Sequence, residues 1–146
     1  MIDNFELEEY AWLSNFYLVD IEYKGIIYPS VEHAFQSAKC ENKDWKAKCL
    51  DRNIKPGKIK VLAKHVGMIE GWNQLRLEVM KECIRNKFSK DPLRQKLIDT
   101  GQEHIQEGNH WYDAFWGVRT DTGEGKNHLG RIIMEIRDEL IFDIGW

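Results

Sequence analysis

Residues 17–39 read YLVDIEYKGIIYPSVEHAFQSAK, and this stretch predicts where a small sheet gives way to a helix. Two segments rich in β-branched and aromatic residues, 17–23 and 26–28, flank the pair Lys24-Gly25. Short β-type runs separated by two such residues are typical of a β-hairpin. The sequence therefore predicts two antiparallel strands before the first helix.

The residues after this hairpin predict a helix-rich remainder. Pro29 ends the second strand because proline has no N–H for a neighbouring strand, and Ser30 can cap a helix over about 31–40. The segment 73–88 has apolar residues at three- and four-residue steps, which indicates an amphipathic helix. We expect one α+β domain over 1–146, helix-rich with a small antiparallel sheet. Further elements are expected as helices at about 44–51, from Pro56 to Gly67, 92–99 (capped by Asp91, with Pro92 in the first turn) and 129–142, and a short strand at 104–107.

The composition excludes several classes of protein. The 21 Lys and Arg against 24 Asp and Glu give a net charge of −3, so no basic excess predicts sequence-independent binding of nucleic acid, although a local basic groove stays compatible with it. The three cysteines form no CxxC pair or zinc-like cluster, and we expect them reduced. We expect no secretory signal in the acidic N-terminal segment, and no apolar run approaches the ~20 residues that span a membrane. We expect a cytoplasmic protein.

The predicted helix after Ser30 carries a first candidate pair of reactive groups. Glu32 and Lys39 share one face of this helix with Phe35 or Gln36, because residues three, four and seven apart stack. A carboxylate and an amine there could act as an acid and a base. The spacing alone favours a solvated pair on the surface. His33 is expected to be structural, hydrogen-bonded near the helix start.

The segment 108–126 is expected to be a loop, since it is dense in Gly, Asp, Asn and Thr. It also carries four aromatic residues, and loops on a rigid scaffold often carry function. Asp113 lies three residues before Trp116, so a carboxylate beside an aromatic face would suit a flat heterocycle. The alternative, equally supported, is an aspartate that caps its own loop, with aromatics that fill the core.

Two further segments are candidate anion sites. Trp72 and Arg76 lie at the start of the helix at 73–88, where amide groups and a guanidinium could hold a phosphate. A packing tryptophan explains this segment at least as well. Lys126 follows two glycines, but Asn127 stands where a Walker A motif requires Ser or Thr, so a nucleoside triphosphatase is disfavoured. A flexible loop before a helix is the alternative.

Taken in order, these segments resemble the NADAR family, whose bacterial branch is called YbiA. The likeness covers nearly the whole chain, and the ordered set is more specific than any one motif. The matching segments are Trp12-Leu13-Ser14-Asn15-Phe16, Tyr28 to Gln36 with Lys39, Trp72 with Arg76 and Met80, Lys87-Phe88, Leu97 to Gly101, Asp113-x-x-Trp116-Gly117, and Gly125-Lys126-Asn127-x-Leu129-Gly130 with Met134 and Arg137.

The resemblance implies a YbiA-like fold and hydrolysis of N-glycosidic bonds. Family substrates include phosphoribosylamino-pyrimidine intermediates of riboflavin synthesis and ADP-ribose attached to a nucleobase such as guanine. Many members have a second glycine where this chain has Arg119, a departure that bears on loop closure and substrate choice. The resemblance implies catalytic residues at Glu32, Asp113 and Lys39, and substrate-binding residues at Trp72, Trp116, Asn15 and Phe16; Arg76 and Lys126 are our candidates for phosphate contacts.

These residues suggest two mechanisms and one non-enzymatic alternative. Glu32 and Asp113 would act as a carboxylate pair across an aromatic-walled cleft, or the amine of Lys39 would form a Schiff base with the ring-opened sugar. No metal or cofactor is required. We expect the partner to be a ribosylated small molecule or an ADP-ribosylated nucleic acid, and we expect no binding to a membrane. The sequence leaves the oligomeric state open. The alternative is a module that binds ADP-ribose or a nucleotide without catalysis.

Overall fold

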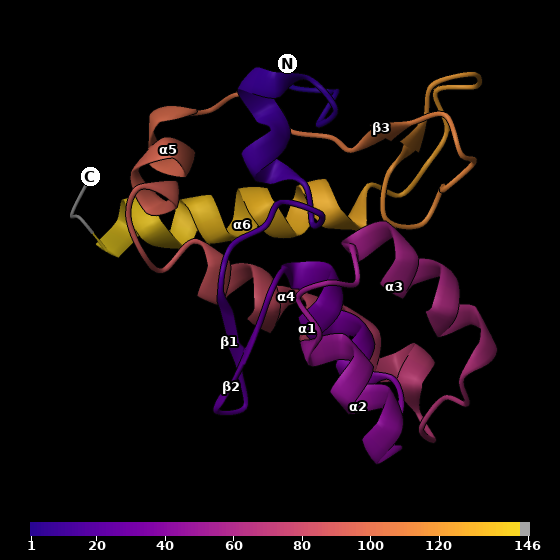
Figure 1. Cartoon of the computed structure of the whole chain (residues 1–146). Helices are drawn as coiled ribbons and strands as arrows, with labels where there is room; N and C mark the ends of the chain where they lie inside the picture. Colours follow the sequence, from indigo (N-terminus) through magenta and orange to yellow (C-terminus); the bar gives the residue numbers. More distant parts are fainter. Residues whose placement is uncertain (144–146) are drawn as a thin grey trace. The chain divides into compact units, whose positions relative to one another are not determined.

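The computed structural model describes residues 1–143, and within them the chain forms two compact units. The central unit comprises residues 15–87, and the terminal unit comprises residues 1–14 together with the chain from residue 88 onward. Figure 1 shows the elements of both units, coloured along the sequence.

The central unit begins with the predicted β-hairpin. Strands β1 (Ile21–Tyr23) and β2 (Ile26–Tyr28) pair antiparallel. The turn has φ values of 50° at Lys24 and 80° at Gly25, the left-handed conformation that a two-residue hairpin turn requires. The first strand is shorter than predicted, because Pro29 cannot extend the ladder. The Pro29 carbonyl still accepts one hydrogen bond from the Val19 amide, at 3.1 Å.

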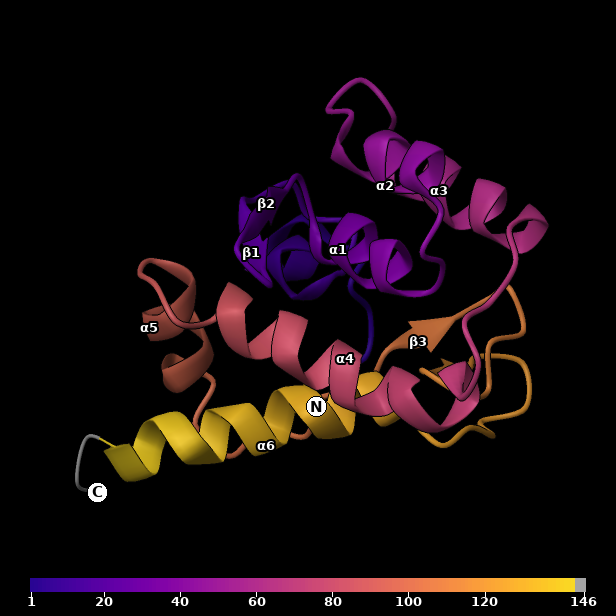
Figure 2. The same ribbon diagram turned by 90° about the horizontal axis from the view of Figure 1, so that it is seen from below.

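Four α-helices follow the hairpin in the central unit. Figure 2 shows α1 beside the hairpin, and α1 and β1 both contact α4. The fully buried side chains of this unit include Ile21, Val31, Ile59 and Cys83. Leu75, at the start of α4, is 42% exposed, so the inward-facing apolar track predicted for this helix does not reach its first turn. The elements are α1 (Val31–Ala38), α2 (Lys43–Leu50), α3 (Pro56–Leu62), the 3-10 turn η2 (Ala63–His65) and α4 (Trp72–Lys87).

The terminal unit is built around the long helix α6 (His128–Asp143). The strand predicted at 104–107 is displaced: Ile105 forms an isolated bridge with Ile2, and the strand itself is β3 (Gly108–Asn109). Helix α5 begins one residue later than predicted, although Asp91 Oδ1 still accepts from the Gln95 amide at 3.2 Å. The remaining elements are η1 (Glu8–Leu13), α5 (Leu93–Asp99) and β4 (Val118–Arg119), which pairs parallel with β3.

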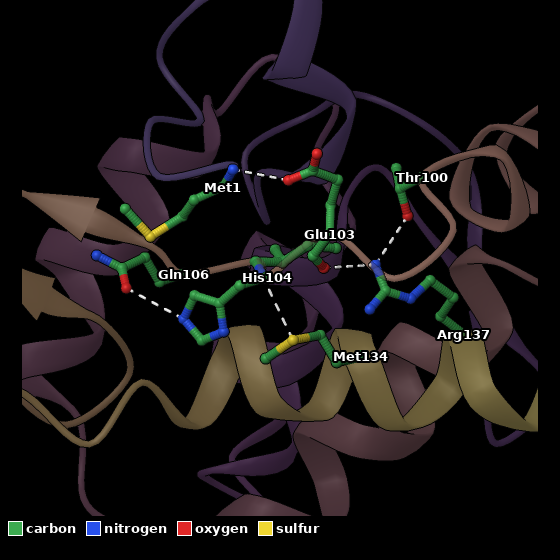
Figure 3. Close-up of polar contacts among 8 residues, drawn as sticks. Met1, Thr100, Glu103, His104, Gln106, Met134 and Arg137 are labelled. Atoms are coloured by element: carbon green, nitrogen blue, oxygen red, sulfur yellow. Dashed lines mark hydrogen bonds and ion pairs between the residues drawn. The ribbon is translucent and has the colours of Figure 1, made fainter.

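Side chains of α6 fasten the segment that leads from α5 to β3 (Figure 3). Arg137 Nη1 donates to Thr100 Oγ1 at 3.0 Å and to the Glu103 carbonyl at 2.8 Å. The Ile105 amide lies 3.4 Å from Met134 Sδ. This fastening sets the start of the loop that carries Asp113.

The fold confirms the predicted α+β class, with helices dominating and one small antiparallel sheet. The three cysteines are free thiols. Among the described helices, none has the length and apolar character needed to cross a membrane.

Candidate active site

A buried histidine network sets the start of α1. Ser30 caps the helix, its Oγ accepting from the His33 amide at 3.2 Å. The His33 ring joins Ser30 Oγ at 2.7 Å and the Ile54 carbonyl at 2.7 Å. Since a carbonyl can only accept, Nε2 carries the proton and Nδ1 accepts from the serine hydroxyl. Burial lowers the pKa of His33, which favours this neutral ring. The predicted structural role of His33 is confirmed.

Glu32 is buried, with 5% of its surface exposed. The prediction from its spacing, a solvated residue on the surface, is therefore wrong for Glu32. Its Oε1 accepts from Gln36 Nε2 at 3.0 Å, one turn along the predicted face. Its backbone amide donates to the Asn15 carbonyl at 3.1 Å. A buried carboxylate is costly to desolvate, so its buried position needs an explanation.

Asn15 and Phe16 are the first two residues of the central unit. Asn15 is 9% exposed; its Nδ2 lies 3.5 Å from Met80 Sδ, and its Oδ1 is sealed without a hydrogen-bond partner among residues 1–143. Buried polar atoms are usually hydrogen-bonded, so an acceptor without a partner is an exception. Phe16 is 42% exposed, and Lys60 Nζ lies 5.9 Å from its ring centroid. The structure thus places Asn15 beside the backbone of Glu32.

Lys39 is half-buried at the C-terminal end of α1. Its ammonium donates to the Ala63 carbonyl, and burial lowers the pKa of its amine. A lowered pKa raises the fraction of neutral, nucleophilic amine. Sequence reasoning missed a second such amine. Lys87 is 3% exposed, burial lowers its pKa to about 7, and its Nζ lies 5.7 Å from the Tyr17 ring.

Trp72 begins α4 as a buried side chain, 5% exposed, with its ring centroid 5.1 Å from that of Phe35. It lines a pocket of the central unit that includes neither Glu32 nor Lys39. At the helix start the amides of Trp72, Gln74 and Leu75 already bond to carbonyls of residues 69 and 71. These bonds favour the packing role for Trp72 over an anion site built from backbone amides. Arg76 lies half-buried one turn along.

In the terminal unit, Asp113 is held by four short bonds. Its Oδ1 accepts from the amides of Phe115 and Trp116, at 3.0 and 2.9 Å. Its own amide donates to Asn109 Oδ1 at 2.9 Å, and Asn109 Nδ2 donates to its carbonyl at 2.9 Å. The self-capping interpretation is therefore confirmed for Oδ1. The second oxygen, Oδ2, makes no hydrogen bond within residues 1–143, so it stays open to a ligand.

Trp116 forms an aromatic cluster with its neighbours. Its ring lies 4.8 Å from that of Phe115, at 90°, and the Phe115 ring lies 4.6 Å from that of His128. A side chain at Gly117 would collide with the backbone carbonyl and carboxylate of Glu107 and with the Asn109 amide group. Only glycine lets the chain after Trp116 approach β3 so closely.

Lys126 and Arg119 are the two cationic residues between Trp116 and α6. Lys126 has an exposed side chain, and its amide donates to the Ala114 carbonyl at 2.8 Å. Arg119 lies in β4 and forms two bonds with Asp121, at 3.0 and 2.7 Å, while its guanidinium lies 4.9 Å from the Tyr112 ring centroid. Arg119 thus places a cation over the ring of Tyr112, the residue that precedes Asp113 in the sequence.

Two buried asparagines were missed as supports of this loop. Asn109 clamps Asp113, as described above. Asn127 is 6% exposed; its Oδ1 accepts from the Glu107 amide at 3.0 Å and its Nδ2 donates to the Ile105 carbonyl at 3.0 Å. Its φ of 53° is a left-handed conformation that asparagine tolerates. The signal available in the sequence was an asparagine four residues before a candidate aspartate, a spacing suited to local side-chain bonds.

The candidate residues divide between the two units. The structure brings Glu32, Gln36 and Asn15 together in the central unit, and it brings Asp113 together with Trp116 in the terminal unit. The closeness of Glu32 and Asp113 stays a prediction. The central unit supplies Asn15, Phe16, Glu32, Lys39, Trp72 and Arg76, and the terminal unit supplies Asp113, Trp116 and Lys126.

Comparison with known proteins places this geometry in a family. A model of the NADAR domain matches residues 4–141, which includes both units. A riboflavin biosynthesis protein of Vibrio vulnificus is 35% identical over 135 residues, 91% of this chain but 36% of the relative. This chain thus spans about a third of that protein. The N-glycosidase YbiA of Escherichia coli is 28% identical over 143 residues, 93% of this chain and 85% of the relative. The NMR structure of the E. coli protein YbiA superimposes with a TM-score of 0.84 at 28% identity, covering 99% of this chain and 89% of that one.

Proposed function

Because the chain belongs to the NADAR family, we propose that it is an N-glycosidase that hydrolyses the bond between C1′ of a ribosyl group and a nitrogen. The observation that carries the proposal is the carboxylate of Glu32, 5% exposed and held by Gln36 at 3.0 Å. A buried acid that serves only the fold costs free energy that an apolar residue of similar volume would not. A buried acid that handles a proton has a reason to stay.

The chemistry requires two functions at the scissile bond. Breaking a C1′–N bond passes through a state with cationic character at C1′, while the leaving nitrogen gains electrons and needs a proton. Water must then reach C1′ and lose its own proton. A pair of carboxyl groups satisfies these needs when one donates the proton and the other stabilises the cation or orients the water.

We assign the proton transfer to Glu32 and the second function to Asp113. The two amides on Asp113 Oδ1, at 3.0 and 2.9 Å, fix the orientation of the group and leave Oδ2 for water or for the sugar. The assignment requires that Glu32 of the central unit and Asp113 of the terminal unit face one substrate molecule. Trp116 would stack on the base or sugar beside Asp113, and Trp72 would form part of the wall behind Phe35.

A covalent variant uses Lys39. Its neutral amine would attack C1′ and displace the nitrogen of the base, which leaves with a proton. The ring of the resulting glycosylamine on the lysine then opens to an imine, and water hydrolyses this imine to release the sugar and regenerate the amine. Burial lowers the pKa of Lys39, which supports this variant, and its bond to the Ala63 carbonyl would have to break first. Borohydride reduction during turnover, followed by peptide mass spectrometry, tests it. A sugar adduct on Lys39 supports the variant. An adduct on Lys87 or no adduct removes Lys39 from a covalent role.

The substrate carries a phosphorylated ribose in both forms that we propose. The name of the Vibrio vulnificus relative favours a phosphoribosylamino-pyrimidine. ADP-ribose on a nucleobase such as guanine is the second form, and the exposed Lys126 and the half-buried Arg76 would meet its phosphates. Asn15 Oδ1, a buried acceptor without a partner among the described residues, would take a hydroxyl of the sugar after its side chain turns, and the exposed ring of Phe16 would contact the substrate.

Release of free base from a panel of N-ribosides tests the proposal. Glu32→Gln and Asp113→Asn should each lower the rate by roughly 10²–10⁴-fold, the usual loss for a general acid or base. The matched controls Glu70→Gln and Asp44→Asn alter exposed carboxylates and should keep the wild-type rate. Near-wild-type rates in Glu32→Gln and Asp113→Asn would remove both from the mechanism.

The alternative is a module that binds ADP-ribose or a nucleotide without cleaving it. Such a module gains little from a buried carboxylate, because the ligand is itself an anion. A bound complex with no base release by the wild-type chain, across both substrate classes, would decide for this alternative.

A further inference from the structure

The central unit contains a pocket that shares Trp72 with the proposed substrate site but includes none of the candidate catalytic residues Glu32, Asp113 and Lys39. It has a volume of about 540 Å³ and lies among the β-hairpin, α1, α2 and α4. Sites for small ligands commonly measure about 300–1,000 Å³. Its walls include Tyr23, Tyr28, Trp72, Leu75, Glu78 and Glu82.

The pocket lies on a different face of α1 from the candidate catalytic residues. The residues of α1 that line it are Ser37 and Ala38. Successive residues of a helix are rotated by about 100°, so both point more than about 100° away from Glu32. Glu32 and Lys39 are absent from the lining.

Two tyrosines in this pocket carry hydroxyls that the fold leaves unsatisfied. Tyr23 and Tyr28 are 6% and 2% exposed, and both line the pocket. Neither hydroxyl has a hydrogen-bond partner among residues 1–143, and neither belongs to the atoms sealed from solvent. A buried tyrosine hydroxyl usually finds a partner. These two therefore open into the pocket and offer hydrogen bonds to whatever fills it.

The charge of the pocket is locally acidic. Glu78 and Glu82 lie one turn apart on α4, and neither forms an ion pair within the described residues. Like charges at this spacing destabilise a helix by about 0.2–0.5 kcal/mol. The lysine Lys46 is engaged by Glu41 at 3.9 Å and by the Ser37 carbonyl at 3.2 Å.

The second lysine, Lys24, lies 5.6 Å from the Tyr23 ring centroid. Burial first, and then nearby groups that include Glu82 and Glu41, raise the pKa of Tyr23 to about 12, so its hydroxyl stays neutral. The lining thus carries three carboxylates (Glu41, Glu78 and Glu82) against two ammonium groups (Lys24 and Lys46), a net charge of −1, and the two α4 carboxylates are the ones without an ion-pair partner among the described residues.

We propose that this pocket is a second binding site, for a small organic cation: a primary ammonium or guanidinium on a flat or apolar body. The body packs against Tyr28, Trp72 and Leu75. The cation lies between Glu78 and Glu82, where charge-assisted hydrogen bonds are stronger than neutral ones. The tyrosine hydroxyls accept from the remaining N–H groups.

Titration of the whole chain with phenethylamine, followed by heteronuclear NMR, tests the site. The wild type should bind at millimolar probe, with shifts at Tyr23, Tyr28 and α4. The neutral isostere 2-phenylethanol should bind at least about tenfold more weakly, which corresponds to about 1.4 kcal/mol.

Variants locate the cation. Glu78→Gln with Glu82→Gln should weaken phenethylamine about tenfold or more, and Tyr23→Phe should weaken it by a smaller factor. The control Glu70→Gln lies outside the lining and should bind as the wild type does. The carboxylates are exposed, so the double variant should fold, which circular dichroism verifies. Absence of binding, equal affinity for 2-phenylethanol, unchanged affinity in the double variant, or shifts centred on Gln36 would overturn the proposal.

Discussion

The two candidate carboxylates are held in contrasting ways. Glu32 lies in the first turn of a regular helix, where Ser30 caps the chain and burial leaves 5% of the side chain exposed. Asp113 lies in an irregular loop. The Asn109 side chain bonds to its backbone, and two loop amides donate to its carboxylate. Helix capping and burial thus position Glu32, whereas the position of Asp113 depends on individual polar contacts. Substitutions around Asp113 should therefore lower stability more than substitutions around Glu32, and their effects should be more local.

Gly117→Ala should give the largest loss of stability. The added methyl group would meet the backbone of Glu107, which cannot rotate away, and such overpacking costs about 1–3 kcal/mol or more. Urea denaturation measures the change in the free energy of unfolding. Gly67→Ala is the control, because no atom lies within 4 Å of its added Cβ. An unchanged midpoint for Gly117→Ala would show that β3 and the loop do not pack as described.

Asn109→Ala should come next, at about 2 kcal/mol, because it leaves the amide and the carbonyl of Asp113 without partners. It should also lower base release, since Asp113 would lose its fixed orientation. Activity and unfolding measured on one preparation separate the two effects. Asn53→Ala, at an exposed loop position, should change neither. Full activity in Asn109→Ala would mean that its clamp is irrelevant to the reaction.

Ser30→Ala should destabilise by about 1–2 kcal/mol, the upper range for a lost N-cap, since the His33 ring also loses its partner. Asn42 caps α2 in an exposed position, its Oδ1 accepting from the Trp45 amide at 3.0 Å. Asn42→Ala should cost less, about 1 kcal/mol or below. Thermal and urea unfolding compare the two. Equal losses would mean that the histidine network adds nothing to the cap.

The pH dependence from His33 should be the smallest effect. Burial lowers its pKa in the folded chain below the ordinary value of 6.5, so below that pH the unfolded chain binds a proton that the folded chain refuses. Stability is therefore complete above pH 6.5 and falls as the pH drops toward the folded-state pKa, by at most about 1.4 kcal/mol per pH unit. Unfolding at pH 7.5 and 5.5 should show a shallower slope in His33→Asn. Identical slopes would contradict a neutral buried ring.

The hairpin, the Ser30 cap and the long helices followed from local rules, because turn residues, caps and apolar periodicity act over a few positions. The burial of Glu32 did not follow, since its spacing from Lys39 fits a solvated face equally well. Only packing against the rest of the central unit decides this point. The clamp from Asn109 to Asp113 also escaped prediction, because contacts inside an irregular loop have no period. The parallel pairing of β3 and β4 joins segments too short to give a strand signal.

The central claim is that Glu32 and Asp113 act on the same C1′–N bond, and a double-mutant cycle on kcat/KM for base release tests it most directly. Groups that act as a unit are strongly non-additive. We predict that Glu32→Gln with Asp113→Asn loses about as much activity as the more severe single variant. Losses that simply multiply, or a single variant with wild-type kcat/KM, would contradict the shared site.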